Sequence, residues 1–358
     1  MNLLMFNLAV DGEHVTLAFG LRWIEALAKR YEHIDLVTMY EGRHRLPPNV
    51  HVRSVGRERG YPKWFRLLRF YWLVLAVLRQ RRPAVVFSHM IPLFSVLFWP
   101  LAKIWNLPSV LWYAHGATPR TLRLAHRLVD RVVSSTPQGF RLPSQKVAFI
   151  GQGIDAGAYP YSPHRRGDVL HLITVGRLAP SKGQHRLVEA LATWRQKTTL
   201  PWQLAIIGDA TSPAEREYAA AVRKLAADAL PSDQVTFTGR LDPSEISPLL
   251  AAADLFISLG TTGSLDKTIV EAMASGCPVI SCNDAFRAIA EAESFGACVI
   301  ADTTESLQAA LDDFVAMSDE ARQHLAAEQS RIARRDHMLE GLIERLAGVL
   351  EEAAGGRR

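Results

Sequence analysis

The sequence predicts an α/β protein built from two doubly wound, Rossmann-like parallel sheets. Short apolar runs alternate with amphipathic segments along the chain, a pattern typical of parallel sheets covered by helices on both faces. Residues 161–168 have linker composition, and the alternation begins again after them. The 358 residues are also enough for two separate cores.

The expected elements follow from these apolar runs and from helical spacing. In the first half we expect strands over 1–10, 34–38, 50–55, 84–88, 109–114, 131–135 and 146–150. We expect helices there over 15–31, with Leu17, Leu21 and Ile24 on its apolar face, and over 91–105. In the second half we expect strands over 169–175, 203–208, 235–239, 255–258, 279–281 and 297–300. Its helices are expected over 184–194, 214–230, 243–253, from Lys267 onward, and through most of 305–352.

The domain boundaries follow from the linker. We expect an N-terminal domain over 1–160 and a C-terminal domain over 161–335. A helix over 336–358 should pack back on the N-terminal domain and end in a frayed tail. Ligands of such sheets bind at the carboxyl ends of the strands, here in the cleft expected between the domains.

Composition narrows the class of protein. Hydrophobic content of 48% and charged content of 22% are ordinary for a globular chain, with a net charge of +5. Three cysteines without metal-ligand spacing predict buried thiols in a reducing compartment. The N-terminus reads as a strand rather than a signal peptide, and no apolar run is long enough for a transmembrane helix. A cytoplasmic protein is expected.

The segment 259–283 has the strongest local pattern of a binding site. It leaves an apolar strand, passes through a glycine-containing loop and enters a helix. Ser264 and Asp266 are suitable helix N-caps, and Gly276 is placed to end the helix. A helix N-terminus presents N–H groups without intrahelical partners and a partial positive charge, which suit a phosphate.

Lys267 and Glu271 are four residues apart on this expected helix. A lysine in the first helical turn opposes the helix dipole, and a bound phosphate would relieve that conflict. The alternative is an ordinary surface ion pair, although Lys before Glu is its weaker orientation.

A second basic loop follows the first strand of the second half. Gly176 permits a turn, and Arg177 and Lys182 supply two cations just before the next helix. Guanidinium and ammonium groups suit a diphosphate and can stabilise charge on a leaving group. The alternative is a solvated basic loop.

Taken together and in order, these motifs carry a resemblance. The strings VGRLAPSKG (175–183), VTFTGRL (235–241) and VEAMASGCPVI (270–280) resemble the retaining nucleotide-sugar glycosyltransferases of family 4, or glycosyl transferases group 1. That family has the GT-B fold, with two Rossmann-like domains facing a central cleft. The resemblance covers nearly all of the second half, whereas the first half matches only in outline.

The resemblance implies a role for individual residues. Arg177 and Lys182 match the pair that grips the donor diphosphate, and Glu271 matches the second glutamate of an E-x7-E motif, which holds the ribose. His115 matches a histidine near the transferred sugar, and with Asp266, Arg177 and Lys182 it forms the implied catalytic set. The residues implied to bind the donor are Gly12, Gly176, Arg177, Lys182, Gly208, Arg240, Leu241, Gly263, Ser264, Leu265, Asp266, Lys267 and Glu271.

One position departs from the family pattern. Gly263 stands where the first glutamate of E-x7-E belongs. Asp266 and Lys267 could have taken over contacts to the sugar and diphosphate, which leaves an active enzyme. Alternatively, the chain is a catalytically silent nucleotide-sugar-binding or partner protein. A third alternative, a GT-B epimerase, needs an acid–base set that we do not identify in the sequence.

The implied reaction moves a sugar from a UDP- or GDP-sugar to a saccharide or lipid-linked acceptor in polysaccharide biosynthesis, with retention. Cationic side chains would stabilise the leaving group, so neither a metal ion nor another cofactor is expected. The sequence does not identify the sugar, the linkage or the oligomeric state.

The segment 61–82 predicts a further partner. Its aromatic and leucine side chains are interleaved with Lys63, Arg66 and Arg69, as in helices that lie in a membrane interface. We therefore expect contact with an anionic membrane at its inner face. The alternative is a buried helix face with a basic N-terminal half. Nucleic acid is not expected as a partner, because no nucleic-acid-binding module is present.

Overall fold

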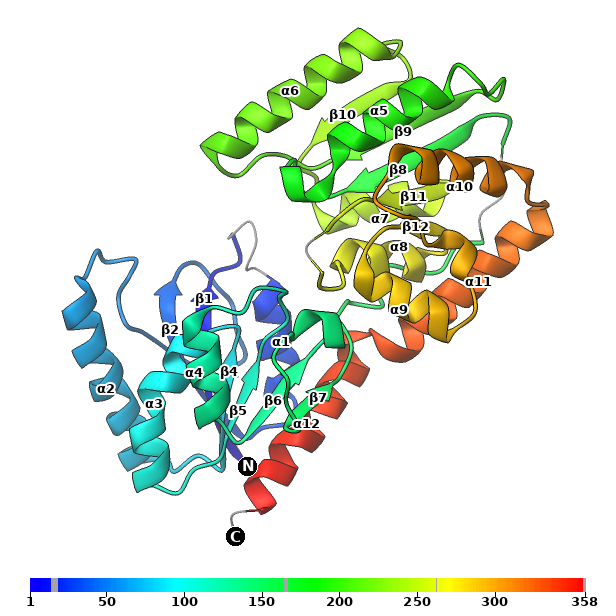
Figure 1. Cartoon of the computed structure of the whole chain (residues 1–358). Coiled ribbons are helices and arrows are strands. Elements are labelled where there is room, and N and C mark those ends of the chain that lie inside the picture. The colour runs from blue at the N-terminus through cyan, green and yellow to red at the C-terminus, as the bar shows by residue number, and fades with distance from the viewer. Residues whose placement is uncertain (14–18, 164–166, 262, 357–358) are drawn as a thin grey trace. The chain divides into compact units, whose positions relative to one another are not determined.

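The computed structural model describes residues 1–13, 19–163, 167–261 and 263–356. The chain divides into two compact units (Figure 1): Met1–Gly151 with Leu339–Arg358, and Gln152–Met338. Among the described residues, no helix has the length and apolar character needed to cross a bilayer. Each unit is an α/β structure around a parallel sheet.

The sheet of the first unit has the strand order β3-β2-β1-β4-β5-β6-β7, and the neighbouring strands run parallel. The central strands are almost entirely buried because both faces of the sheet are covered. The strand bounds are β1 (Asn2–Val10), β2 (His33–Glu41), β3 (Val50–Ser54), β4 (Val85–His89), β5 (Ser109–Trp112), β6 (Arg131–Ser134) and β7 (Val147–Phe149).

Helices cover the two faces of this sheet with different apolar clusters. On one face α1 (Phe19–Ala28) and α12 (Leu339–Gly355) pack against inward side chains of β1, β4 and β5. On the other face lie α2 (Lys63–Gln80), α3 (Pro92–Ile104) and α4 (Arg120–Leu128). The C-terminal helix therefore belongs to the core of the first unit.

The second unit has the strand order β10-β9-β8-β11-β12, again with parallel neighbours. One face is covered by α5, α6 and α10, and the other by α7, α8, α9 and α11. The strand bounds are β8 (Leu170–Val175), β9 (Trp202–Ile207), β10 (Val235–Gly239), β11 (Leu255–Ser258) and β12 (Val279–Ser281). The helix bounds are α5 (Gln184–Trp194), α6 (Pro213–Ala229), α7 (Pro243–Ala252), α8 (Lys267–Ser275), α9 (Asp284–Ala292), α10 (Thr304–Ala316) and α11 (Asp319–Asp336).

The structure departs from the sequence expectations in a few places. The strand expected over 297–300 is wrong, because the chain forms a 3-10 turn at Gly296–Cys298 and only Val299 bridges to β12. The apolar character of Cys298 and Ile300 reflects their burial in two different clusters and does not indicate an extended segment. The helices α4 and α9 were not expected. Leu17, on the expected helix 15–31, lies outside the described residues.

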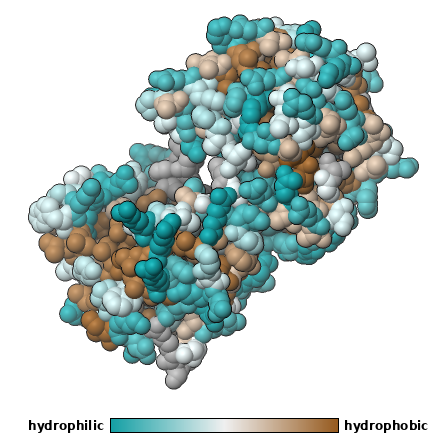
Figure 2. Space-filling model, in the orientation of Figure 1, coloured by the Kyte–Doolittle hydropathy of each residue, from teal (hydrophilic) through white to brown (hydrophobic). Residues whose placement is uncertain are grey.

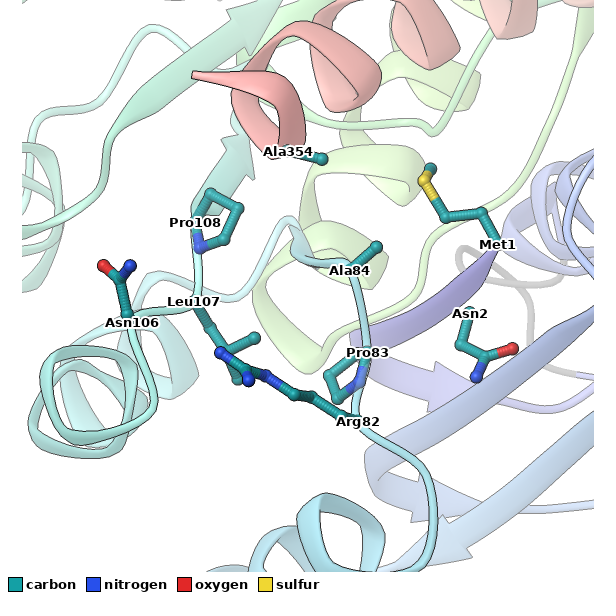
Figure 3. A pocket seen from close by; sticks show the side chains of 9 residues that line it. All are labelled: Met1, Asn2, Arg82, Pro83, Ala84, Asn106, Leu107, Pro108 and Ala354. Atoms are coloured by element: carbon teal, nitrogen blue, oxygen red, sulfur yellow. The ribbon is translucent and has the colours of Figure 1, made fainter. Parts of the chain in front are cut away.

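A hollow of about 500 Å³ lies in the first unit (Figure 3), beside the amino ends of β1, β4 and β5. Asn2, Ala84 and Pro108 line it where those strands begin, Arg82 lies in the segment that leads into β4, and Ala354 belongs to α12. Ligands of open α/β sheets bind at the opposite, carboxyl edge of the strands, so this hollow is not the site expected from the fold.

Candidate functional site

Two loops at the carboxyl edge of the second sheet are joined through glycines. The Gly176 amide after β8 donates to Ile207 O (2.9 Å), and the Gly208 amide after β9 donates to Gly239 O (2.8 Å). Gly208 has φ +130°, and a Cβ there would lie 2.0 Å from Gly176 O. Only glycine fits this close approach of two backbones. The loops after β8 and β9 and the end of β10 therefore form one connected edge.

The basic loop after β8 meets the loop that leads into α8. Lys182 lies in the short 3-10 turn Pro180–Lys182, and its Nζ is 2.7 Å from Asp266 Oδ2. The loops also join through their backbones, because the Thr261 amide donates to Ser181 O (3.1 Å). A Cβ at Gly260 would lie 2.7 Å from Asp266 Oδ2, so a side chain there would displace the carboxylate. Both charged side chains are more than four-fifths buried.

Asp266 occupies the N-cap position of α8, as the sequence predicts, but its side chain makes no capping hydrogen bond. The carboxylate pairs with Lys182 instead. The first-turn amides of the helix therefore lack both an intrahelical partner and a cap from Asp266. Gly276 ends the helix with φ +84°, as predicted from the sequence. The amino end of α8 keeps donors that suit an anion.

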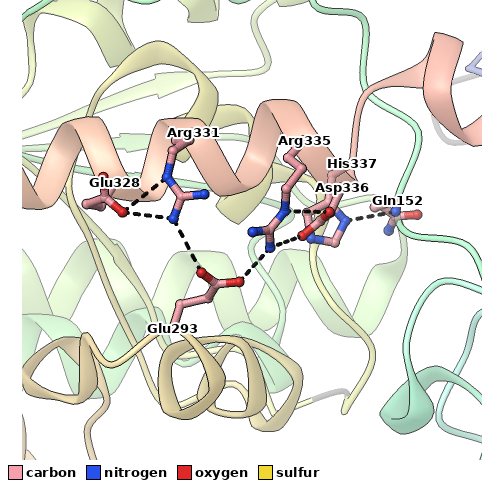
Figure 4. A network of polar contacts seen from close by, with 7 residues as sticks. All are labelled: Gln152, Glu293, Glu328, Arg331, Arg335, Asp336 and His337. Atoms are coloured by element: carbon pink, nitrogen blue, oxygen red, sulfur yellow. Dashed lines mark hydrogen bonds and ion pairs between the residues drawn. The ribbon is translucent and has the colours of Figure 1, made fainter.

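Distant residues hold the carbonyl groups of the loop before α8. Gln152 Nε2 donates to Leu265 O (2.9 Å), and Asn283 Nδ2 donates to Ser264 O (3.0 Å). The backbone amide of Gln152 in turn donates to His337 Nδ1 (3.0 Å), at one end of the polar network drawn in Figure 4. Fixing these carbonyls orients the peptide groups that follow them, including those at the start of α8.

The pair Lys267–Glu271 spans the first turn of α8, and both side chains are partly buried. Burial lowers the pKa of Lys267 to about 8, and the charge of Glu271 opposes that shift. Burial raises the pKa of Glu271, against the influence of Lys267 and of a hydrogen bond from Tyr159. Arg334 on α11 holds the same tyrosine through Tyr159 O (2.8 Å). This burial distinguishes the pair from the ordinary surface ion pair weighed above.

Arg177 also has a carboxylate partner. Its Nη1 lies 2.8 Å from Glu215 Oε1, in the first turn of α6. Thr211 donates to the other oxygen of Glu215 through its amide and hydroxyl, and with the charge of Arg177 these contacts lower the pKa of Glu215. Without a ligand, carboxylates therefore already pair with Arg177 and Lys182, and the charge of Glu271 acts on Lys267.

The remaining residues expected in the second unit have different environments. Arg240 is exposed and Leu241 is partly buried, both just after β10. Gly263 is buried with φ +82°. A glutamate in that backbone conformation would be strained by about 1 kcal/mol or more, so the departure from E-x7-E includes the loop conformation as well as the side chain.

Two expected residues lie in the first unit, at the carboxyl ends of its strands. Gly12 follows β1 and donates its amide to Arg43 O (2.7 Å). His115 follows β5 and is exposed, and its Nδ1 accepts a hydrogen bond from the Ala117 amide (2.9 Å). The neutral tautomer consequently carries its proton on Nε2. An approach of Gly12 or His115 to a donor remains a prediction.

Sequence reasoning missed several residues that support the site: Gln152, Tyr159, Thr211, Glu215, Asn283, Arg334 and His337. Glu215 had a usable signal, because Ser212-Pro213 followed by an acid is a helix-start pattern, and Ser212 does cap α6. Gln152 had none, because its partners lie 113 and 185 residues away in the chain.

Part of the chain is similar to a known protein family. Residues 162–331 match the family described as Glycosyl transferases group 1. The chain is 31% identical over 157 residues to a GDP-mannose-dependent alpha-(1-6)-phosphatidylinositol monomannoside mannosyltransferase of Mycobacterium tuberculosis. That match spans 39% of this chain and 39% of the relative's length.

Two solved structures are similar over almost the whole chain. Sucrose-phosphate synthase from Thermosynechococcus elongatus has a TM-score of 0.78 at 16% identity, covering 99% of each chain. Anabaena Alr3699/HepE in complex with UDP has a TM-score of 0.75 at 18% identity, covering 98% of this chain and all of that one. At such identities these similarities establish the fold, which is GT-B. Residues 162–331 thus match the Glycosyl transferases group 1 family, in a chain whose two Rossmann-like units have the GT-B fold.

Proposed function

We propose that this protein is a glycosyltransferase that moves a sugar from a nucleoside-diphosphate sugar to a saccharide or lipid-linked acceptor. The observation that carries the proposal is the joining of Lys182 and Asp266 at the amino end of α8, within a group 1 domain. The mannosyltransferase relative is named as GDP-mannose-dependent, and the Anabaena structure contains UDP. These names support UDP or GDP as the nucleotide.

In this proposal the donor diphosphate lies between the basic loop after β8 and the amino end of α8. Lys182 exchanges its carboxylate partner for phosphate oxygens, and the first-turn amides of α8 donate to the same group. Arg177 and Lys267 add positive charge nearby, and the Glu271 carboxylate accepts hydrogen bonds from the ribose hydroxyls. As the bond to the sugar breaks, negative charge grows on the diphosphate, where fixed donors lower the barrier most. Because these groups supply the positive charge, we propose that transfer needs no metal ion.

Asp266 takes the role of the missing glutamate in this mechanism. The diphosphate displaces its carboxylate from Lys182, and the freed oxygens accept hydrogen bonds from hydroxyls of the donor sugar. His115 then lies on the acceptor side of the sugar, with Gly12 near the diphosphate. We propose that transfer retains the anomeric configuration and passes through an oxocarbenium-like state. NMR of the newly formed anomeric linkage tests the retention directly.

The acceptor class follows from two kinds of support. The phosphatidylinositol monomannoside named for the mycobacterial relative is a lipid-linked saccharide, and exposed aromatic residues of segment 61–82 suit an anionic membrane surface. We therefore propose a cytoplasmic enzyme that works at the inner face of a membrane.

A catalytically silent nucleotide-sugar-binding protein is the second candidate, and Gly263 is the observation that favours it. Release of nucleoside diphosphate separates the candidates. The enzyme should release many equivalents per protein molecule from its UDP- or GDP-sugar when a lipid-linked saccharide extract is added, and EDTA should leave the rate unchanged. Release of no more than one equivalent with every donor and extract would favour the silent protein. Loss of activity in EDTA, restored by a divalent ion, would contradict the metal-free mechanism alone.

A further inference from the structure

We propose that the outward faces of α2 and α3 together form a docking surface for an anionic lipid bilayer. This inference deepens the proposed function, because a bilayer would present a lipid-linked acceptor to the enzyme. Only the biological purpose of the contact rests on the proposed function. The contact itself rests on exposure, helix packing and charge within the first unit.

Exposed apolar side chains are concentrated on these two helices. The described residues include twelve large apolar side chains that are exposed, of which five lie on α2 and three on α3. Trp64, Leu68 and Trp72 are 60–65% exposed, and Ile104 is 72% exposed. In Figure 2 brown residues gather at the lower left, over α2 and α3. The eight side chains are Trp64, Phe65, Leu67, Leu68, Trp72, Leu93, Trp99 and Ile104.

The exposed residues are additional to the helix face that packs in the core. Phe70, Leu73 and Val77 of α2 are buried against the sheet and α3. Residues 64, 68 and 72 follow one another at intervals of four along the outer side of α2, and all three are apolar. The buried-face alternative therefore accounts for Phe70 and the buried residues of 73–78, whereas the exposed Trp64, Phe65 and Trp72 need another explanation.

The two helices pack directly against each other, so their outer faces adjoin. Tyr71 Oη donates to Leu97 O (3.0 Å), and the rings of Phe70 and Phe94 have centroids 4.7 Å apart. Arg82 Nη2, just beyond α2, donates to Trp105 O (2.8 Å), just beyond α3. Figure 1 shows α2 and α3 side by side along one side of the first unit.

Charge selects an anionic bilayer as the occupant. Neither α2 nor α3 contains an aspartate or glutamate. The exposed cations on or next to them are Lys63, Arg79, Arg81, Arg82 and Lys103. Each such cation strengthens binding to an anionic surface by roughly fivefold. A second copy of the same surface would bring like charges together, which opposes self-association. Tryptophan suits the bilayer interface because its ring is apolar and its N–H can remain hydrated.

The expected contact lies along the membrane surface, since no described helix is suited to span one. The test is co-sedimentation of the full chain with phosphatidylcholine vesicles, with and without about one-third phosphatidylglycerol, at low salt. We expect binding only to the anionic vesicles. Replacing three exposed apolar residues (Trp64→Ser, Leu68→Ser and Trp72→Ser) should weaken it by about a hundredfold, because binding scales with buried apolar area.

Matched controls separate the surface from general effects. The double variant Leu124→Ser and Leu249→Ser removes exposed apolar residues from α4 and α7 and should bind vesicles like wild type. Lys63→Gln, Arg79→Gln and Lys103→Gln together should weaken anionic binding by about a hundredfold. Thermal melting of every variant should match wild type, because all the changed side chains are exposed.

Several outcomes would overturn the inference. Failure of the wild type to sediment with anionic vesicles would do so, as would undiminished binding of the triple apolar variant. A wild-type dimer in light scattering that the triple variant converts to a monomer would assign the surface to a second copy. Displacement of bound vesicles by short RNA would assign it to nucleic acid. Nucleotide binding measured without vesicles is independent of these results, so this inference and the proposed function can fail separately.

Discussion

Lys182 Nζ lies 2.7 Å from Asp266 Oδ2, and this ion pair joins the two loops expected to bind the donor. The Asp266 carboxylate is thus paired with the ammonium group that a bound diphosphate would use. The pair lies at the amino end of α8, where the helix also favours negative charge. A donor must compete with Asp266 for Lys182, and the same competition would free Asp266 to meet the sugar.

Replacing Asp266 with asparagine should separate nucleotide binding from transfer. Because the competing carboxylate is absent, the nucleoside diphosphate that binds wild type should bind Asp266→Asn at least as tightly. Transfer should fall by roughly 10- to 150-fold in kcat/KM, which corresponds to one lost hydrogen bond to a charged group. Calorimetry and a product-release assay measure the two effects.

The control for this variant is Glu215→Gln, which removes the carboxylate partner of the more exposed Arg177. This change should affect transfer much less, because Glu215 is not expected to contact the sugar. Weaker nucleotide binding together with unchanged transfer in Asp266→Asn would contradict the role given to Asp266.

The pH dependence of nucleotide binding should report the partly buried Lys267. Its pKa is lowered to about 8 in the unliganded protein, whereas phosphate needs the protonated ammonium. Affinity should therefore be nearly constant below pH 8 and fall by up to about tenfold per unit above it. Ionisation of the nucleotide phosphates does not contribute to this decline in affinity above pH 8, because their last pKa lies near 6. Lys267→Arg should remove the dependence, and a decline that persists in that variant would assign it to another group.

The same lowered pKa has the opposite effect on the stability of the free protein. Unfolding restores the ordinary pKa of about 10.4 to Lys267. Between pH 8 and that value the unfolded state binds more protons, so this group alone makes the fold more stable as pH rises. Thermal melting over that range should show a smaller rise, or a steeper decline, for Lys267→Met than for wild type.

Gly208 and Gly239 provide a matched test of the connected sheet edge. Both have positive φ, but a Cβ at Gly239 meets nothing within 4 Å, whereas one at Gly208 would lie 2.0 Å from Gly176 O. Gly239→Ala should cost about 1 kcal/mol of conformational strain, or about 2–4 °C in Tm. Gly208→Ala should lower Tm by at least twice as much and weaken nucleotide binding. Equal effects of the two changes would contradict the close approach described for Gly208.

Much of the fold could be predicted from the sequence, because it rests on local patterns. The apolar runs and helical periods locate most strands and helices, and Gly276 ends α8 as its position predicts. The helices α4 and α9 escaped notice although both are amphipathic. The strand expected over 297–300 was wrong, because Cys298 and Ile300 are buried side chains of a segment that is not extended.

The candidate site was less predictable, because its partners come from distant parts of the chain. Sequence spacing indicated Lys267 with Glu271, four residues apart on one helix. It could not indicate that Lys182 pairs with Asp266 or that Arg177 pairs with Glu215, since strand order decides these contacts. Nor could it indicate that Tyr159 and Gln152 support α8 and the loop before it.

The most direct test of the donor site is a thermal-shift series with UDP, GDP, ADP and their sugar conjugates on wild type, Glu271→Gln and the exposed control Glu291→Gln. A ligand at one hundred times its Kd should stabilise wild type by about 2.7 kcal/mol, or about 5–10 °C for a unit of this size. We expect one nucleotide family to shift wild type and the control equally, and Glu271→Gln to lose more than half of that shift. No shift with any nucleotide, or an equal shift in all three proteins, would contradict the donor site at the amino end of α8.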